Sequence, residues 1–119
     1  MYEASRFYSL LAFFLLYNVT YPVTFVLMIK SFQHKGLRLF FENEDATKLP
    51  AAHTTRIRNI LTRLEFAKSL DDIGTPGSRL HPLSGKLKGF YAVNVSGNWR
   101  IIFRFEDGDI FDIDYLDYH

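Results

Sequence analysis

Three alternating runs near the end of the chain, joined by two short glycine-containing turns, constrain the fold more than any other feature. Residues 90–95, 99–105 and 110–116 alternate apolar and polar side chains, which is the pattern of half-buried strands. Ser96-Gly97-Asn98 separates the first two runs, and Glu106-Asp107-Gly108 separates the last two. Because turns of this kind join neighbouring antiparallel strands, the sequence predicts a three-stranded antiparallel meander.

The second turn can close in two ways, and a slip of one residue exchanges the two faces of a strand. A two-residue Asp107-Gly108 loop mixes carboxylates into the apolar face. A three-residue loop with a left-handed Gly108 and a bulge avoids this cost of burial, so we expect that register. It gives three apolar pairs: Phe103 with Phe111, Ile101 with Ile113, and Trp99 near Tyr115. The uncovered face then carries Arg100, Ile102, Arg104, Asp114, Asp112 and Ile110.

Helical patterns precede the meander. Met28–Phe32 reads as a short edge strand, and the apolar residues after it predict a short amphipathic helix that ends at Asp45–Leu49. Pro50 suits the first turn of a longer helix, whose apolar stripe is Ile57, Ile60, Leu61, Leu64 and Ala67. We therefore expect an α+β domain, with two N-terminal helices packed on the Trp99/Ile101/Phe103 face of a small antiparallel sheet.

Composition limits the chain to one modest core and indicates where its charges lie. With 119 residues and no cysteine, the chain has no disulfides or thiolate nucleophiles, and a reducing cytoplasm is the expected location. Residues 28–104 contain 13 Lys/Arg and 6 Asp/Glu, whereas residues 105–119 contain 6 acids and no Lys or Arg. A basic body of this kind can present a positive surface to phosphate groups.

Residues 1–27 differ in composition from the rest, since residues 7–27 carry no charge over a length that can span a bilayer. A signal peptide fits poorly because Glu3 and Arg6 cancel and no small-residue cleavage site follows. A membrane anchor is a second alternative. We favour a third, in which residues 1–27 are an upstream or leader extension and the domain comprises residues 28–119, starting at Met28.

Four motifs combine in the C-terminal half: Leu80-His81-Pro82-Leu83-Ser84-Gly85, a glycine-aromatic strand, Gly97-Asn98-Trp99-Arg100-Ile101-Ile102-Phe103-Arg104-Phe105, and a terminal Asp117-Tyr118-His119. Together they resemble the HigB-type toxins of the RelE/ParE superfamily, also known as plasmid maintenance killer proteins, over about residues 28–119. The resemblance implies a RelE-like fold and a ribosome-dependent endoribonuclease that cuts messenger RNA. It also implies silencing by a cognate helix-turn-helix antitoxin of the HigA type, with the ribosome and messenger RNA as further partners and no cofactor or membrane.

RNA can be cut without a metal when its own 2′-hydroxyl attacks the adjacent phosphate, which requires a base, an acid and a cation. Arg100 is the candidate cation, because its planar fork fits two phosphate oxygens. The resemblance makes His81, Asp117, Tyr118 and His119 the other candidate catalytic residues, with His119 the favoured proton-transfer group. Taken alone, these residues have simpler explanations: a structural His81, a frayed terminus, and cross-strand pairing of Arg100 with Asp114.

Six further basic residues are candidates for binding RNA: Arg56, Arg58, Arg63, Lys86, Lys88 and Arg104. The alternative for the three helical arginines is an ordinary solvated face, and for Arg104 a cross-strand ion pair with Asp112. Ser84 stands where many relatives of this family carry a catalytically useful lysine. Lys86 or Lys88 can replace that lysine, or activity is weaker.

Two rival functions remain open at this stage. A ParE-like protein of the same fold inhibits DNA gyrase by contact and lacks the nuclease residues, while a membrane-tethered homologue would be inactive. A metal site formed by His81, Asp117 and His119 matches no standard ligand spacing, so no metal is expected.

Overall fold

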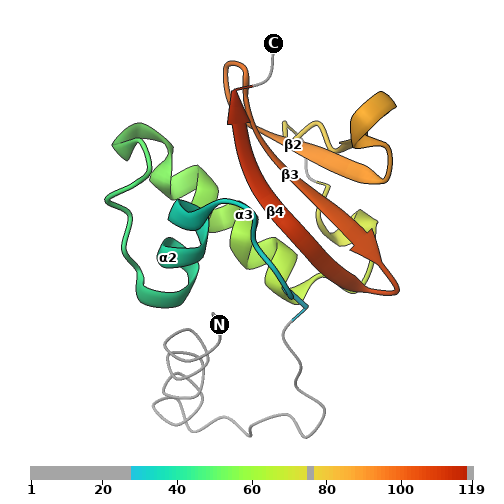
Figure 1. Cartoon of the computed structure of the whole chain (residues 1–119), viewed down its shortest axis with the longest axis horizontal. Helices are drawn as coiled ribbons and strands as arrows, with labels where there is room; N and C mark the ends of the chain where they lie inside the picture. Colours follow the sequence, from blue (N-terminus) through green and yellow to red (C-terminus); the bar gives the residue numbers. More distant parts are fainter. Residues whose placement is uncertain (1–27, 75–76, 118–119) are drawn as a thin grey trace, which may run out of the picture.

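Two helices lie on one side of a four-stranded antiparallel sheet, as the α+β prediction required (Figure 1). The computed structural model describes residues 28–74 and 77–117. The main elements are α2 (Lys35–Asn43), α3 (Thr54–Phe66), β1 (His81–Pro82), β2 (Phe90–Ser96), β3 (Trp99–Glu106) and β4 (Asp109–Asp117). Short 3₁₀ turns occupy Ala51–His53, Leu70–Asp72 and Gly85–Leu87. The three alternatives for residues 1–27 concern a segment outside the described residues. The predicted start of the domain at Met28 depends on that segment and stays a prediction.

Both predicted helices are present, although Pro50 caps a 3₁₀ turn (Ala51–His53) and α3 itself begins at Thr54. The N-cap of α2 is His34, whose Nδ1 accepts a hydrogen bond from the backbone N–H of Leu37 at 3.1 Å. The helix ends at Glu44, which is left-handed with φ of 57°. The predicted stripe of α3 is buried along its whole length against the sheet. Over the described ranges, no helix has the length and apolar character needed to cross a membrane.

The sheet has the order β1-β2-β3-β4, so the predicted meander is confirmed and extended by a two-residue first strand. The predicted edge strand at residues 28–32 is present as two isolated parallel bridges along β4, Ile29 with Ile110 and Phe32 with Ile113. Hydrogen bonds from Lys30 N to Ile110 O at 2.7 Å and from Ile113 N to Ser31 O at 3.1 Å support it. As a result, β4 has backbone partners on both sides.

The predicted register of β3 and β4 is wrong. Glu106 pairs with Asp109 around a two-residue Asp107-Gly108 turn, in which both residues have positive φ, 51° and 85°. This geometry is that of the type I′ turn that Asp-Gly favours. The pairs that form instead of the predicted ones are Ile101 with Tyr115, Ile102 with Asp114, Trp99 with Asp117 and Arg104 with Phe111.

A bulge inside β4 avoids the burial of carboxylates that would otherwise follow from a two-residue turn. The pairing shifts by one residue between Phe111 and Asp114, where Asp112 is left-handed with φ of 55°. The extra residue returns Ile113 and Tyr115 to the helix-covered face. Ile110, which was expected on the uncovered face, is fully buried in the same core. A bulge within β4, and not a longer turn, therefore keeps the carboxylates out of the core.

Asp112 is the polar centre of this bulge. Its carboxylate accepts hydrogen bonds from Arg104 Nε at 2.8 Å, Gln33 Nε2 at 3.2 Å and Ser31 Oγ at 3.4 Å. Its backbone N–H donates to Ser31 Oγ at 2.8 Å. The hydrogen bond from Arg104 is the main reason that the pKa of the Asp112 carboxyl lies below its ordinary value. Three segments distant in sequence are thus joined at one side chain.

The Asp112→Asn variant tests this arrangement. Asparagine tolerates the left-handed conformation, so the change removes the charge and leaves the backbone undisturbed. We expect a loss of about 1 kcal/mol in the free energy of unfolding at pH 7, measured by urea denaturation. Because the folded-state pKa of Asp112 is lowered, this stability is present above the unfolded carboxyl pKa of about 3.9 and is lost as the pH falls through the lower folded value.

Asp109→Asn is the matched control. Asp109 lies 4.0 Å from the ammonium of Lys30, and both side chains are about one-third exposed. The expected loss is less than about 0.5 kcal/mol. Equal losses for the two variants would contradict the central role of Asp112.

Candidate functional site

The uncovered face of the sheet brings together two of the predicted catalytic residues, His81 and Arg100. His81 pairs with Ala92 on β2, and Arg100 pairs with Asn94, two residues further along the same strand. Residues two apart on a strand share a face, so both side chains project from the side of the sheet opposite the helices. With adjacent strands about 4.8 Å apart, the two Cα atoms are separated by roughly 12 Å.

The guanidinium of Arg100 is held by neutral oxygen atoms. Its Nη1 donates to Asn94 Oδ1 at 2.5 Å, to the carbonyl of Gly97 at 2.7 Å and to that of Trp99 at 3.1 Å. The predicted alternative, an ion pair with Asp114, does not form; Asp114 instead accepts a hydrogen bond from the backbone N–H of Tyr115. Within the described part of the chain, Nε and Nη2 of Arg100 make no hydrogen bond or ion pair. This edge of the fork can meet an anion with its positive charge uncompensated.

The His81 side chain is exposed and oriented by the turn that precedes it. Nδ1 lies 2.6 Å from the carbonyl oxygen of Arg79, a residue with φ of 53°. A carbonyl can only accept a hydrogen bond, so the neutral ring carries its proton on Nδ1. The remaining Nε2 presents a lone pair to the open face, which is the tautomer that proton abstraction requires.

The C-terminal residues of the predicted site, Asp117, Tyr118 and His119, are only partly described. Asp117 pairs with Trp99, whereas its neighbour Leu116 pairs with Arg100. Strand alternation therefore directs the Asp117 side chain away from the face of Arg100. Tyr118 and His119 lie outside the described residues. In residues 28–74 and 77–117, no cluster of three His, Asp or Glu side chains is arranged to hold a metal ion.

The predicted RNA-binding residues fall into two groups. Arg58 pairs with Glu44 at 2.5 Å and lies over the ring of Phe40, and Arg104 pairs with Asp112 and Glu106. Carboxylates therefore compensate these two charges. Four residues have no carboxylate partner among the described residues: Arg56, Arg63, Lys86 and Lys88. Lys86 and Lys88 are exposed in and just after the 3₁₀ turn between β1 and β2.

The predicted proximity of Trp99 to Tyr115 is confirmed, but sequence reasoning missed the histidine rings that complete a cluster with them on the helix-covered face. Trp99 stacks on Tyr115 at a centroid distance of 4.7 Å, and the Tyr115 hydroxyl is hydrogen-bonded to Nδ1 of His53. His34 meets Tyr115 edge-on at 5.6 Å. Burial raises the pKa of Tyr115 and lowers that of His34, for which the nearby charge of Asp114 offsets part of the shift. The cluster fixes the end of β4, which carries Asp117.

Comparisons with known proteins agree with this fold. Residues 30–119 match the family described as "RelE-like toxin of type II toxin-antitoxin system HigB". The chain is 40% identical over 92 residues to "Endoribonuclease HigB" of Proteus vulgaris, an alignment that covers 77% of this chain and all of that protein. It is 32% identical over 94 residues to "Toxin HigB-1" of Vibrio cholerae, covering 77% of this chain and 98% of that protein.

These matches define the class first as a RelE-like toxin, in agreement with the helix-backed antiparallel sheet. More narrowly, the chain belongs to the HigB-like family of toxins from type II toxin-antitoxin systems. A toxin of this type has an antitoxin as its partner.

Protonation of His34 is expected to weaken the fold below neutral pH. The lowered folded-state pKa means that the unfolded chain binds a proton more readily, so stability is complete above about pH 6.5 and declines as the pH falls toward the folded value. A protonated ring also cannot accept the capping hydrogen bond from Leu37. The His34→Asn variant keeps an N-cap acceptor and is expected to flatten the unfolding free energy between pH 5 and 7, measured by urea denaturation. A slope equal to that of the unmodified chain would contradict this assignment.

Proposed function

We propose that this toxin is a ribosome-dependent endoribonuclease that cuts messenger RNA in the cytoplasm and so arrests translation and growth. The observation that carries the proposal is the placement of Arg100 and His81 on one uncovered face, with a free guanidinium edge and a free imidazole nitrogen. The Proteus vulgaris relative named an endoribonuclease supports the activity. A HigA-like helix-turn-helix antitoxin, the ribosome and messenger RNA are the proposed partners.

The proposed reaction is an internal transfer of the phosphoryl group. A base removes the proton of the 2′-hydroxyl, the 2′-oxygen bonds to the adjacent phosphorus, and the bond to the 5′-oxygen breaks as an acid protonates that oxygen. The products are a 2′,3′-cyclic phosphate and a 5′-hydroxyl. Arg100 binds the two non-bridging oxygens, where negative charge increases in the transition state.

Proton transfer is assigned to His81 and His119. Nε2 of His81 is unprotonated in the neutral tautomer and open to solvent, which suits it to accept or return a proton. His119 serves as the complementary group, which Asp117 orients, while Tyr118 positions the RNA. Arg56, Arg63, Lys86 and Lys88 bind phosphates on either side of the cleaved bond. The ribosome holds the messenger strand in the extended form that in-line attack requires.

Arg100→Ala tests the proposed cation. Cleavage of a reporter messenger RNA in a translating bacterial extract is expected to slow by about 10²–10³-fold, because one charge-stabilising interaction in the transition state is lost. Lys30→Gln removes a positive charge from the opposite edge of the sheet and is expected to leave the rate unchanged. Undiminished cleavage and growth arrest by Arg100→Ala would exclude the assignment. Accumulation of cleaved gyrase-DNA complexes on induction, without messenger cleavage, would favour a ParE-like inhibitor.

His81→Asn tests the proposed proton transfer. Asparagine preserves a hydrogen-bonding residue at the first position of β1 but has no ring nitrogen that can accept and return a proton. We expect the cleavage rate in the same extract to fall by about 10²-fold or more, with the thermal unfolding midpoint little changed because the residue is exposed. A rate within threefold of the unmodified chain would assign His81 to structure alone.

A further inference from the structure

Carboxylates compensate some arginines of α3 and β3 and leave others uncompensated. Arg58 and Arg104 face carboxylates, as described above. Arg56 instead donates to two backbone carbonyls, that of Asn94 at 3.4 Å and that of Gly77 at 3.2 Å. No hydrogen bond or ion pair with any described residue engages Arg63, which is exposed. Arg56, Arg63 and Arg100 therefore retain their full positive charge.

One residue, Asn94, is hydrogen-bonded to two of these arginines. Its backbone carbonyl accepts from Nε of Arg56, which approaches from the helix side, and its Oδ1 accepts from Nη1 of Arg100 on the uncovered face. Strand β1 pairs with β2 only at Tyr91 and Ala92, so Asn94 lies on the edge of the sheet beyond β1. There its N–H donates to the carbonyl of Ser78 at 2.7 Å.

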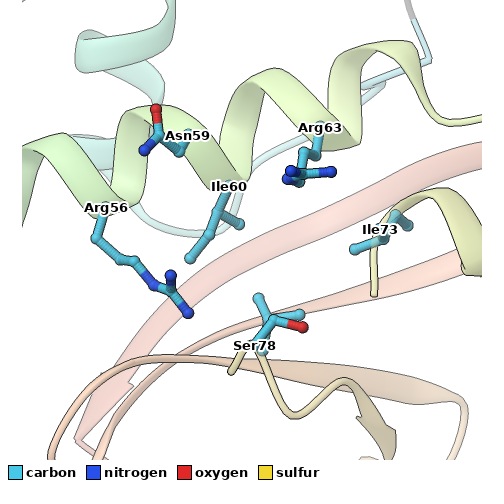
Figure 2. Close-up of a pocket in the computed structure, with 7 residues that line it drawn as sticks. Arg56, Asn59, Ile60, Arg63, Ile73 and Ser78 are labelled. Carbon is cyan, nitrogen blue, oxygen red and sulfur yellow. The ribbon is translucent and has the colours of Figure 1, made fainter. Parts of the chain in front are cut away.

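On the helix side of this edge, a shallow groove separates α3 from the chain around Ser78. Arg56, Asn59 and Arg63 recur at intervals of three and four residues and thus share one face of the helix. Figure 2 shows Arg56 and Arg63 extending from α3 with Ile60 between them, and Ser78 and Ile73 across the groove. Arg56 and Arg63 make the groove basic, and Ile60, Ile73 and Val93 line its apolar part.

We propose that Arg63, Arg56 and Arg100 form one continuous binding track for the phosphates of single-stranded RNA, which passes over the edge of β2 at Asn94. Asn94 is a positioning residue in this track: it orients both guanidiniums with neutral oxygens and does not reduce their charge. The proposal rests on the proposed function and adds the route by which the strand reaches Arg100 and His81. Upstream or downstream nucleotides lie in the α3 groove while the cleaved bond lies on the uncovered face.

The chemistry of the track favours RNA over a protein segment. Protein interfaces depend on large apolar or aromatic anchors at their centre, whereas Phe66 is the one large hydrophobic side chain strongly exposed in the described ranges. Phe66 does not line the groove. Guanidiniums without a carboxylate partner, two of which are held in place by hydrogen bonds, match the repeating phosphates of a nucleic acid backbone.

The test compares Asn94→Asp with Asn94→Ala in the full chain. Aspartate has the shape of asparagine and keeps the bond to Arg100, but its charge neutralises the guanidinium; alanine removes the bond and leaves the charge. Binding is measured by fluorescence anisotropy with a labelled 12-nucleotide single-stranded RNA that carries 2′-O-methyl groups and cannot be cleaved. We expect Asn94→Asp to weaken binding about fivefold or more and to reduce the salt dependence by about 0.7 in log–log slope. Asn94→Ala loses the orienting bond to Arg100 but keeps the charge, so we expect it to weaken binding less than Asn94→Asp does and to leave the salt dependence unchanged.

Two variants in α3 test the part of the track that lies in the groove. Arg63→Gln is expected to weaken binding by about threefold or more. Arg58→Gln, five residues earlier in the same helix but at a position paired with a carboxylate, is expected to stay within twofold. Urea denaturation of each variant confirms that the fold is retained.

Several outcomes would overturn the track. These are equal binding by Asn94→Asp and the unmodified chain, weaker binding by Asn94→Ala than by Asn94→Asp, absence of oligonucleotide binding at low salt, and a loss confined to antitoxin affinity. Because the probe cannot be cleaved, the result is independent of catalysis. Retained messenger cleavage with no effect of Asn94→Asp would reject the track alone, and a confirmed track without messenger cleavage would reject the proposed function.

Discussion

The left-handed bulge at Asp112 is the constraint on which the rest of this fold depends. A two-residue Asp-Gly turn places alternate acidic residues of β4 toward the core, and one inserted residue reverses that alternation for Ile113 and Tyr115. The carboxylate that this kink projects outward is then paired with Arg104 and joined to Ser31 and Gln33. The same local distortion therefore sets which residues of β4 are buried and where the chain around residue 31 attaches.

Much of the architecture was predictable from the sequence because it depends on local patterns. The stripe from Ile57 to Ala67 defines a helix, and the alternating runs define three strands. The register of the last hairpin was not predictable in the same way. The prediction weighed two turn lengths and took the strand itself to be regular, so a bulge several residues from the turn was not considered. The argument that carboxylates stay out of the core was correct, but the chain satisfies it by a different backbone solution.

The candidate site shows a similar division. His81 and Arg100 were identified from their motifs, and the pairing of β1, β2 and β3 places them on one face. The alternative ion pair of Arg100 with Asp114 is wrong, because Asp114 pairs with Ile102 in the observed register. Asn94 was overlooked, although the alternation in β2 puts a polar side chain on the same face as Arg100. The rings around His53 and Tyr115 come from segments 62 residues apart in sequence, and no local pattern signals such a contact.

The parallel bridges of residues 29 and 32 to β4 have a consequence for how the chain acquires its structure. Of the described strands, β4 is the latest in sequence, yet it occupies an interior position between β3 and the earliest described segment. This contact joins residues about 80 apart in sequence. The entropic cost of closing that loop must be offset by favourable contacts before the core is complete. During synthesis, the helices and the first hairpin can form while the sheet remains open on one side. The core is completed only when β4 inserts between β3 and residues 29–32.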